Sequence, residues 1–194
     1  MSASERYVEN EIKLRVAAGA EAARTMLEQR GYTMTELRTL ESDQLFDRSD
    51  GELRRTSQLL RLRRAGTRAT VTYKGPPAPG LHKNREEIEF DVSPADALTE
   101  ALQRLGYQPG FRYEKYRTKF AAYGEPGIAS IDETPIGVFL ELEGPPGWVD
   151  RTAAALGFSM ADYITESYAA LYREFRRTHE DAPADMTFEP RQTP

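Results

Sequence analysis

The chain has 194 residues, of which 39% are hydrophobic and 29% charged, and it contains no cysteine. This length suits one globular domain, and the lack of cysteine excludes a disulfide framework and a thiolate metal site. The net charge of −5 provides no global basic field for a nucleic acid polymer. No segment approaches membrane-spanning length and no apolar leader is evident, so we expect a cytoplasmic protein that does not bind membranes.

Strands dominate the predicted secondary structure. Alternation of polar and apolar residues predicts eight of them, over 7–16, 36–47, 58–65, 67–74, 84–92, 111–122, 128–132 and 136–143. Helical spacing predicts four helices, over 20–30, 94–105, 147–156 and 162–177. Beyond these the sequence loses periodicity and is rich in proline and acid. We therefore expect one domain over 1–177 and a disordered tail over 178–194.

Charged side chains recur at every second position of these strands. The first strand, VENEIKLRV (8–16), places Ile12 and Leu14 on one face and Glu9, Glu11 and Lys13 on the other. Residues two apart on a strand share a face, so each charged pair points one way. The acidic pairs are Glu9/Glu11, Glu87/Glu89 and Glu141/Glu143, and the basic residues on the polar faces are Arg61/Arg63, Lys74, Arg85 and Lys115/Arg117.

Two architectures accommodate these charged faces. An open antiparallel sheet would pack its apolar face on helices and leave the charges in water, which composition alone favours. A closed barrel would instead point the charged faces inward and cover its apolar outer face with helices. The segregation of acidic and basic pairs on different strands favours the barrel, because like charges two residues apart repel unless a group of opposite sign lies between them.

A ligand that carries both negative and positive charge would compensate the basic strand faces and the acidic strand faces together. Arginine and lysine bind phosphate oxygens, and carboxylates supply the hard oxygen ligands that Mg²⁺ and Mn²⁺ prefer. These ions also bridge protein and phosphate. The two histidines, His82 and His179, fall in a predicted loop and in the tail, so no histidine cluster for zinc is expected. The charged rows therefore predict a site for a metal–polyphosphate.

The segment Glu9-x-Glu11-x-Lys13 resembles the E-x-E-x-K signature of the CYTH superfamily, also called triphosphate tunnel enzymes. The resemblance covers residues 7–175 and continues in chain order through DQLFD (43–47), LRLR (60–63), TYKGP (72–76), REEIE (85–89), EKYR (114–117), IDETPIGVFLELE (131–143) and SYAALY (167–172). It implies an α+β, mostly β fold, in which a closed antiparallel eight-stranded β-barrel forms a tunnel with flanking helices.

Carried over position by position, the resemblance implies two sets of side chains around a triphosphate. The triphosphate-binding set is Lys13, Arg61, Arg63, Lys74, Arg85, Lys115 and Arg117. The set that faces Mg²⁺ or Mn²⁺ is Glu9, Glu11, Glu87, Glu89, Asp132, Glu141 and Glu143. The candidate catalytic residues are Glu11, through the metal, and Lys13 or Lys74, as a base with a lowered pKa. The alternative is a metal-bound hydroxyl that loses its proton without a dedicated base.

Within the superfamily, TYKGP, REEIEF and the 131–143 run are most similar to the class IV adenylate cyclase branch. This similarity implies conversion of ATP to cyclic AMP and pyrophosphate. It is also compatible with a homodimer. The alternative is a triphosphatase that hydrolyses inorganic triphosphate, thiamine triphosphate or nucleoside triphosphates. A non-catalytic polyphosphate-binding module fits less well, because inward-facing acids would weaken the binding of a bare anion.

Overall fold

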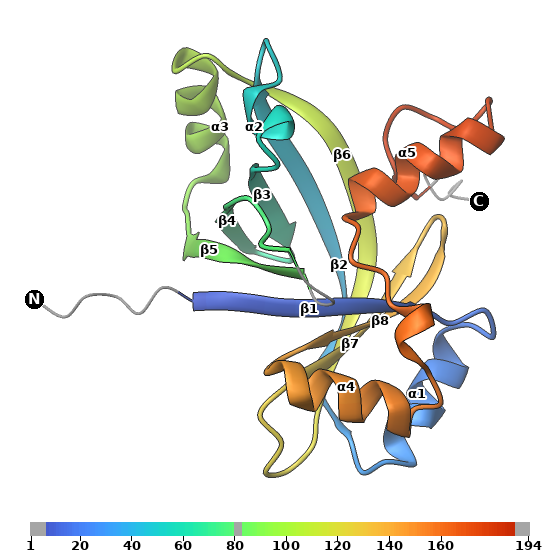
Figure 1. Ribbon diagram of the computed structural model, residues 1–194. Helices are drawn as coiled ribbons and strands as arrows, with labels where there is room; N and C mark the ends of the chain where they lie inside the picture. The colour runs from blue at the N-terminus through green and yellow to red at the C-terminus, as the bar shows by residue number, and fades with distance from the viewer. Residues whose placement is uncertain (1–6, 80–82, 189–194) are drawn as a thin grey trace, which may run out of the picture.

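The computed structural model describes residues 7–79 and 83–188, which form eight strands and five α-helices (Figure 1). The strands are β1 (Tyr7–Arg15), β2 (Thr33–Arg48), β3 (Leu59–Ala65), β4 (Arg68–Lys74), β5 (Lys83–Asp91), β6 (Tyr107–Ala121), β7 (Ile128–Thr134) and β8 (Gly137–Glu143). The helices are α1 (Ala20–Glu28), α2 (Glu52–Arg55), α3 (Ala95–Arg104), α4 (Pro146–Ala155) and α5 (Tyr168–Thr178), with a 3₁₀ helix, η1 (Met160–Asp162), before α5. Within these described ranges, none of the helices has the length and apolar character needed to span a membrane.

The strands form one antiparallel ring in the order β1-β5-β4-β3-β2-β6-β7-β8. The ring closes through β1, whose residues 7–11 pair with β5 and whose residues 11–15 pair with β8. The two pairings share only Glu11, so the barrel opens out away from this point and has the curled shape of a half-barrel in Figure 1. The predicted antiparallel eight-stranded barrel with flanking helices is confirmed, with its closure limited to this crossing of β1.

The long strands β2 and β6 give the barrel its curvature. They contain 16 and 15 residues and pair along almost their whole length, with shifts of register at three places between Met34 and Phe46. Such irregularities bend a strand and increase its twist. Both strands consequently curve around the interior of the barrel (Figure 1).

The apolar faces of the strands point outward and pack on helices. Residues of α1 and α4 cover Ile12 and Leu14, and α3 covers β3 and β4. The helix α5 differs, because it packs on Tyr113 of β6 and Phe139 of β8, which share a strand face with the charged residues Lys115 and Glu141. Ile12 is 0% exposed and the next residue, Lys13, only 2%, so both faces of β1 are buried. An open sheet with its charges in water is thereby excluded, and the barrel with inward charges is confirmed.

The predicted helix over 162–177 is correct only in its second half. Ile164 forms an isolated antiparallel bridge with Lys13, with N–O distances of 2.8 and 2.9 Å between their backbones. The helix α5 begins at Tyr168, where the side chain of Ser167 caps it by accepting a hydrogen bond from the backbone N–H of Ala170. Ile164, which precedes Ser167, therefore pairs with β1 and does not belong to an amphipathic helix.

The chain beyond α5 packs on β6 up to residue 188, within the segment 178–194 that the sequence predicts as a tail. Met186 pairs with Tyr113 of β6 as a parallel bridge and is 0% exposed. The rings of Phe188 and Tyr116 lie 5.1 Å apart between centroids. These contacts depend on β6 and not on any local periodicity, so the sequence pattern does not reveal them. The packing extends past the predicted boundary at 177, and residues 189–194 lie outside the described residues.

Met186→Ala tests the packing of this segment. Removal of a fully buried methionine side chain leaves a cavity, so we expect the free energy of unfolding in a urea titration to fall by about 2–5 kcal/mol. The matched control is Met160→Ala, because Met160 is 58% exposed, and it should change the free energy by no more than about 0.5 kcal/mol. Equal stabilities of the two variants would contradict the buried position of Met186.

Candidate active site

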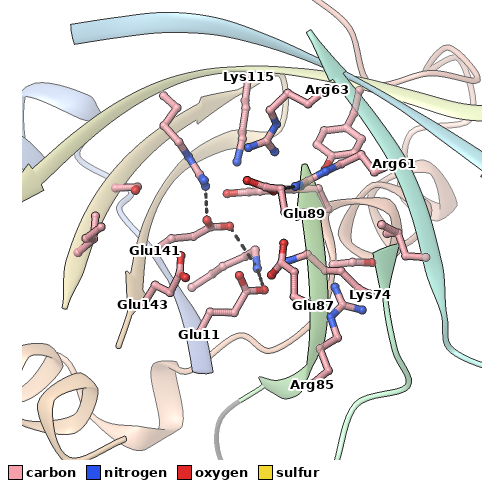
Figure 2. Close-up of a pocket in the computed structure, with 18 of the residues that line it drawn as sticks. Glu11, Arg61, Arg63, Lys74, Arg85, Glu87, Glu89, Lys115, Glu141 and Glu143 are labelled. Atoms are coloured by element: carbon pink, nitrogen blue, oxygen red, sulfur yellow. Dashed lines mark hydrogen bonds and ion pairs between the residues drawn. The ribbon is translucent and has the colours of Figure 1, made fainter. Parts of the chain in front are cut away.

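The charged faces of the strands enclose a cavity of about 740 Å³ inside the barrel, here called the charged cavity (Figure 2). Among the described residues, eight cationic and six carboxylate side chains line it. The cationic residues are Lys13, Arg61, Arg63, Lys74, Arg85, Lys115, Arg117 and Lys119, and the acidic residues are Glu11, Glu86, Glu87, Glu89, Glu141 and Glu143. The cavity therefore carries an excess of two positive charges in a chain whose net charge is −5.

The structure brings most of the predicted site residues together. All seven predicted triphosphate-binding residues line the charged cavity, and so do five of the seven predicted metal-facing acids. Of the other two acids, Asp132 lies outside its lining, and the side chain of Glu9 lies outside the described residues. The sequence analysis missed Lys119, which follows Arg117 on the same face of β6, and Glu86.

Lys13 lies between the acids of β1 and β8. Its Nζ is 3.1 Å from Oε1 of Glu11 and 3.3 Å from Oε1 of Glu141. Burial opposes the charge of Lys13, but the two carboxylates outweigh burial and raise its pKa above the ordinary value. The lowered pKa that a role as general base requires is therefore not found. Lys74, whose Nζ is 3.1 Å from Oε2 of Glu87, stays a predicted catalytic residue.

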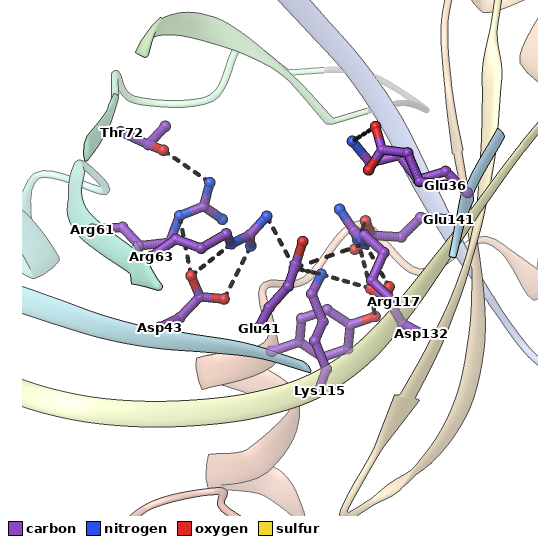
Figure 3. A network of polar contacts seen from close by, with 12 residues as sticks. Glu36, Glu41, Asp43, Arg61, Arg63, Thr72, Lys115, Arg117, Asp132 and Glu141 are labelled. Carbon is purple, nitrogen blue, oxygen red and sulfur yellow. Dashed lines mark hydrogen bonds and ion pairs between the residues drawn. The ribbon is translucent and has the colours of Figure 1, made fainter. Parts of the chain in front are cut away.

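A buried acid that the sequence analysis missed holds the two arginines of β3. Asp43 on β2 is 0% exposed and accepts two hydrogen bonds from Arg63, at 2.8 Å from Nε and 3.0 Å from Nη2 (Figure 3). The Nε of Arg61 lies 3.6 Å from the same carboxylate. Burial would raise the pKa of Asp43, but Arg63 and Arg61 hold it at about 2. Arg61 and Arg63 are thus oriented before any ligand binds.

Glu41 extends this network toward β6. Its Oε2 lies 3.0 Å from Nη1 of Arg63 and 3.6 Å from Nζ of Lys115. These neighbouring cations lower the pKa of Glu41 although burial acts in the opposite direction. Glu41 and Asp43 are two residues apart within the predicted strand 36–47 and therefore share one face. The same alternation that identified the other charged pairs could have identified this acidic pair.

Asp132 holds the cations of β6 and does not line the charged cavity. It is 0% exposed and lies 2.7 Å from Nζ of Lys115 and 2.6 Å from both Nε and Nη2 of Arg117. The hydroxyl of Tyr168 donates a further hydrogen bond of 2.8 Å to the same carboxylate. These contacts fix Lys115 and Arg117, and they leave the metal-binding role predicted for Asp132 without support.

Tyr168 connects the two lysines of the site. Its ring centroid lies 5.3 Å from Nζ of Lys13 and 5.1 Å from Nζ of Lys115, within the range of cation–π attraction. Burial, together with Asp132, raises the pKa of Tyr168, so its hydroxyl stays protonated and able to donate. Burial and the neighbouring Arg117 lower the pKa of Lys115, in spite of the acids around it. The sequence analysis assigned no role to Tyr168.

The carboxylates of Glu11, Glu141 and Glu143 come from the paired strands β1 and β8 and lie on one side of the charged cavity (Figure 2). Hard oxygen donors from neighbouring strands fit Mg²⁺ or Mn²⁺. In the described part of the chain, however, no three acidic or histidine side chains are arranged to hold a metal ion. Glu141 instead contacts Lys13 and Arg117. Metal binding at these acids therefore requires their present ion pairs to open.

The CYTH domain family matches residues 8–168, and the chain belongs to this family. A protein of Methanocaldococcus jannaschii named "putative adenylate cyclase" is 34% identical over 104 residues, which make up 53% of this chain and 58% of that protein. The chain thus spans little more than half the length of this curated relative.

Solved structures share the fold. A "putative adenylate cyclase" of Vibrio parahaemolyticus is 22% identical, with a TM-score of 0.74 over 87% of this chain and 99% of that one. A "putative adenylyl cyclase" of Hippeastrum, described as revealing a dominant triphosphatase activity, is 15% identical, with a TM-score of 0.65 over 87% of this chain and 95% of that one. At these identities the likeness shows the fold alone.

Asp43→Asn should destabilise the protein near neutral pH and reduce its sensitivity to acid. The variant removes the buried counter-ion that Arg61 and Arg63 share and leaves Arg63 with Glu41 alone, so we expect the free energy of unfolding to fall by about 3–5 kcal/mol. The folded-state pKa of Asp43, about 2, is below the ordinary value of 3.8. Its contribution is therefore fully present above the ordinary pKa and is lost as the pH falls through about 2.

Urea unfolding at several pH values checks this prediction. The difference in stability between the wild type and Asp43→Asn should shrink as the pH is lowered through this interval. Asp50→Asn is the matched control, because Asp50 pairs with Arg55 at the surface with 59% of its side chain exposed, and its effect should be small at every pH. A difference for Asp43→Asn that stays constant with pH would contradict the pairing.

Proposed function

We propose that this protein is a metal-dependent enzyme that binds a triphosphate in the charged cavity and acts as a class IV adenylate cyclase on ATP. The observation that carries the proposal is the composition of this cavity, in which eight cationic side chains line the same space as six carboxylates. A triphosphate concentrates several negative charges in a short chain and suits closely spaced fixed cations. A cavity built for anion binding alone would not need the acids.

The orientation of the cations supports a role in catalysis. Asp43 fixes Arg63, and Asp132 fixes Lys115 and Arg117, in each case through a carboxylate that does not line the charged cavity. Donors that are held in place before the reaction stabilise developing charge without a cost of reorganisation. The cavity is thus suited to hold a triphosphate in one position and to stabilise a leaving phosphate group.

The acids of β1 and β8 provide the other half of the proposed site. Mg²⁺ or Mn²⁺ held by Glu11, Glu141 and Glu143 would neutralise phosphate charge and orient the triphosphate. Lys13, kept protonated by Glu11 and Glu141, would bind a phosphate oxygen and replace those carboxylate contacts. We therefore propose an electrostatic role for Lys13 and keep Lys74 as the candidate base.

In the cyclase reaction the ribose 3′-hydroxyl attacks the α-phosphorus of ATP. The bond from the α-phosphorus to the bridging oxygen breaks, the hydroxyl proton is released, and the electron pair leaves with pyrophosphate. The arginines and lysines of β3 and β6 would bind the charge that grows on this leaving group. The products are cyclic AMP and pyrophosphate. A homodimer stays a prediction from the family resemblance, and a cytoplasmic location stays a prediction from the sequence.

A triphosphatase is the second candidate function, and the shared fold with the Hippeastrum protein favours it. In this reaction water attacks the γ-phosphorus, which yields a diphosphate and inorganic phosphate. The same cations would serve, because the two reactions differ in the nucleophile and in the phosphorus atom attacked. The outcome depends on whether the substrate is held with its ribose hydroxyl or a water in line with the bond that breaks.

Incubation with ATP and Mn²⁺, followed by chromatographic separation of the nucleotides, distinguishes the two reactions. The proposal predicts cyclic AMP and pyrophosphate as the main products. ADP and phosphate would support the triphosphatase instead. Consumption of tripolyphosphate while ATP stays intact would reject the cyclase and retain the triphosphate site.

Glu11→Gln tests the metal-binding acids. The amide keeps the shape of the side chain but removes a charged oxygen ligand, so we expect the metal-dependent turnover rate to fall by about a hundredfold or more. The matched control is Glu100→Gln, because Glu100 pairs with Arg104 on the surface of α3, and it should keep the wild-type rate. Full activity of Glu11→Gln with both Mg²⁺ and Mn²⁺ would remove Glu11 from the metal site.

A further inference from the structure

Tyr168 is the first residue of α5, and the barrel holds the chain on both sides of it. Four residues earlier, the backbone of Ile164 exchanges two hydrogen bonds with Lys13 of β1, at 2.8 and 2.9 Å. Beyond α5, Met186 forms a parallel bridge with Tyr113 of β6. The side chain of Tyr168 is 4% exposed, and its ring centroid lies 6.0 Å from that of Tyr113. Contacts with β1 and β6 thus fix the position of this ring at the wall of the charged cavity.

The two lysines that contact this ring cannot be held as the arginines of the site are. A planar guanidinium is fixed by two hydrogen bonds to one carboxylate, as Asp43 fixes Arg63. An ammonium on a flexible four-carbon stem is a point charge without such a fork. Lys13 and Lys115 are 2% exposed, and their Nζ atoms lie 5.3 and 5.1 Å from the ring centroid of Tyr168. One aromatic ring therefore attracts both ammonium groups.

The ring matters most for Lys13, whose other contacts are with carboxylates that line the charged cavity. These carboxylates belong to Glu11 and Glu141, which the proposed function assigns to the metal. A neutral ring attracts an ammonium through its quadrupole and competes neither with the acids for the metal nor with phosphate for the positive charge. Tyr168 can therefore keep its contact with Lys13 while Glu11 and Glu141 exchange their partners.

The hydroxyl of Tyr168 is occupied away from the charged cavity. It donates a hydrogen bond of 2.8 Å to Asp132, a carboxylate that does not line the cavity and that also contacts Lys115. A hydroxyl engaged in this way is not presented to a ligand as an acid or a base. Any effect of Tyr168 on a ligand would consequently act through the lysines.

We propose that Tyr168 is a positioning residue of the triphosphate site, and that its ring holds the ammonium groups of Lys13 and Lys115 in place for the phosphates. This inference rests on the proposed function and deepens it, because it assigns a role to a residue outside both the predicted triphosphate-binding set and the predicted metal-facing set. It also gives the packing of α5 against the charged strand faces a consequence for ligand binding.

Tyr168→Leu removes the ring, whereas Tyr168→Phe removes only the hydroxyl. Calorimetric titration with inorganic tripolyphosphate in EDTA should show the affinity of Tyr168→Leu weakened by about tenfold, as expected from the loss of two cation–π contacts. Tyr168→Phe should stay within about threefold of the wild type, because it presents the same ring face to both lysines. Tyr168→Met, which also lacks a ring but fills more of the space, should repeat the loss seen with leucine.

The matched control is Tyr172→Leu, one turn further along α5. Tyr172 is 3% exposed and packs in the same aromatic cluster, but it does not line the charged cavity. Urea unfolding should show both leucine variants destabilised, and only Tyr168→Leu should lose affinity for tripolyphosphate. Wild-type affinity of both ringless Tyr168 variants, an equal loss in Tyr172→Leu, or a loss in Tyr168→Phe as large as in Tyr168→Leu would each overturn the inference. A wild type that binds no tripolyphosphate would instead refute the proposed triphosphate site, and this inference with it.

Discussion

Charged side chains inside this barrel are stable only in pairs. Asp43 and Asp132 are 0% exposed and Lys13 and Lys115 only 2%. Transfer of an isolated ion from water into a protein interior costs several kcal/mol even after the surroundings relax. Each of these groups accordingly contacts a partner of opposite sign on a neighbouring strand or two residues away on the same one. The antiparallel register, which sets these partners side by side, is therefore also the condition for burying them.

The ion pairs fall into two groups with different consequences for a ligand. Asp43 and Asp132 do not line the charged cavity, so a ligand there does not need to displace them from their arginines. Glu11 and Glu141 do line it, and their contacts with Lys13 must be exchanged for contacts with metal and phosphate. The helices α1, α3 and α4 pack on the outer apolar face, whereas Tyr168 of α5 reaches the charged cavity. Most of the folding core and the proposed site therefore lie on opposite sides of one sheet.

Strand alternation was sufficient to predict the strands, their faces and the basic rows, because the side-chain period of a strand does not depend on its partners. It could not predict that Asp132 contacts Lys115 and Arg117 away from the charged cavity, since this depends on the register between β6 and β7. The buried Met186 was missed for a similar reason, because its partner Tyr113 is remote in sequence. Residues 162–167 have helical spacing, but the bridge from Ile164 to β1 prevailed over it.

The most direct test of an inward-facing triphosphate site is a calorimetric titration of the protein with inorganic tripolyphosphate in EDTA, repeated at increasing salt. Cations fixed around one enclosed ligand predict one tripolyphosphate bound per chain, with an affinity that falls as salt screens the attraction. Orthophosphate, with fewer charges to match, should bind far more weakly under the same conditions. No detectable binding of tripolyphosphate, or several weak sites with the affinity of orthophosphate, would contradict such a site.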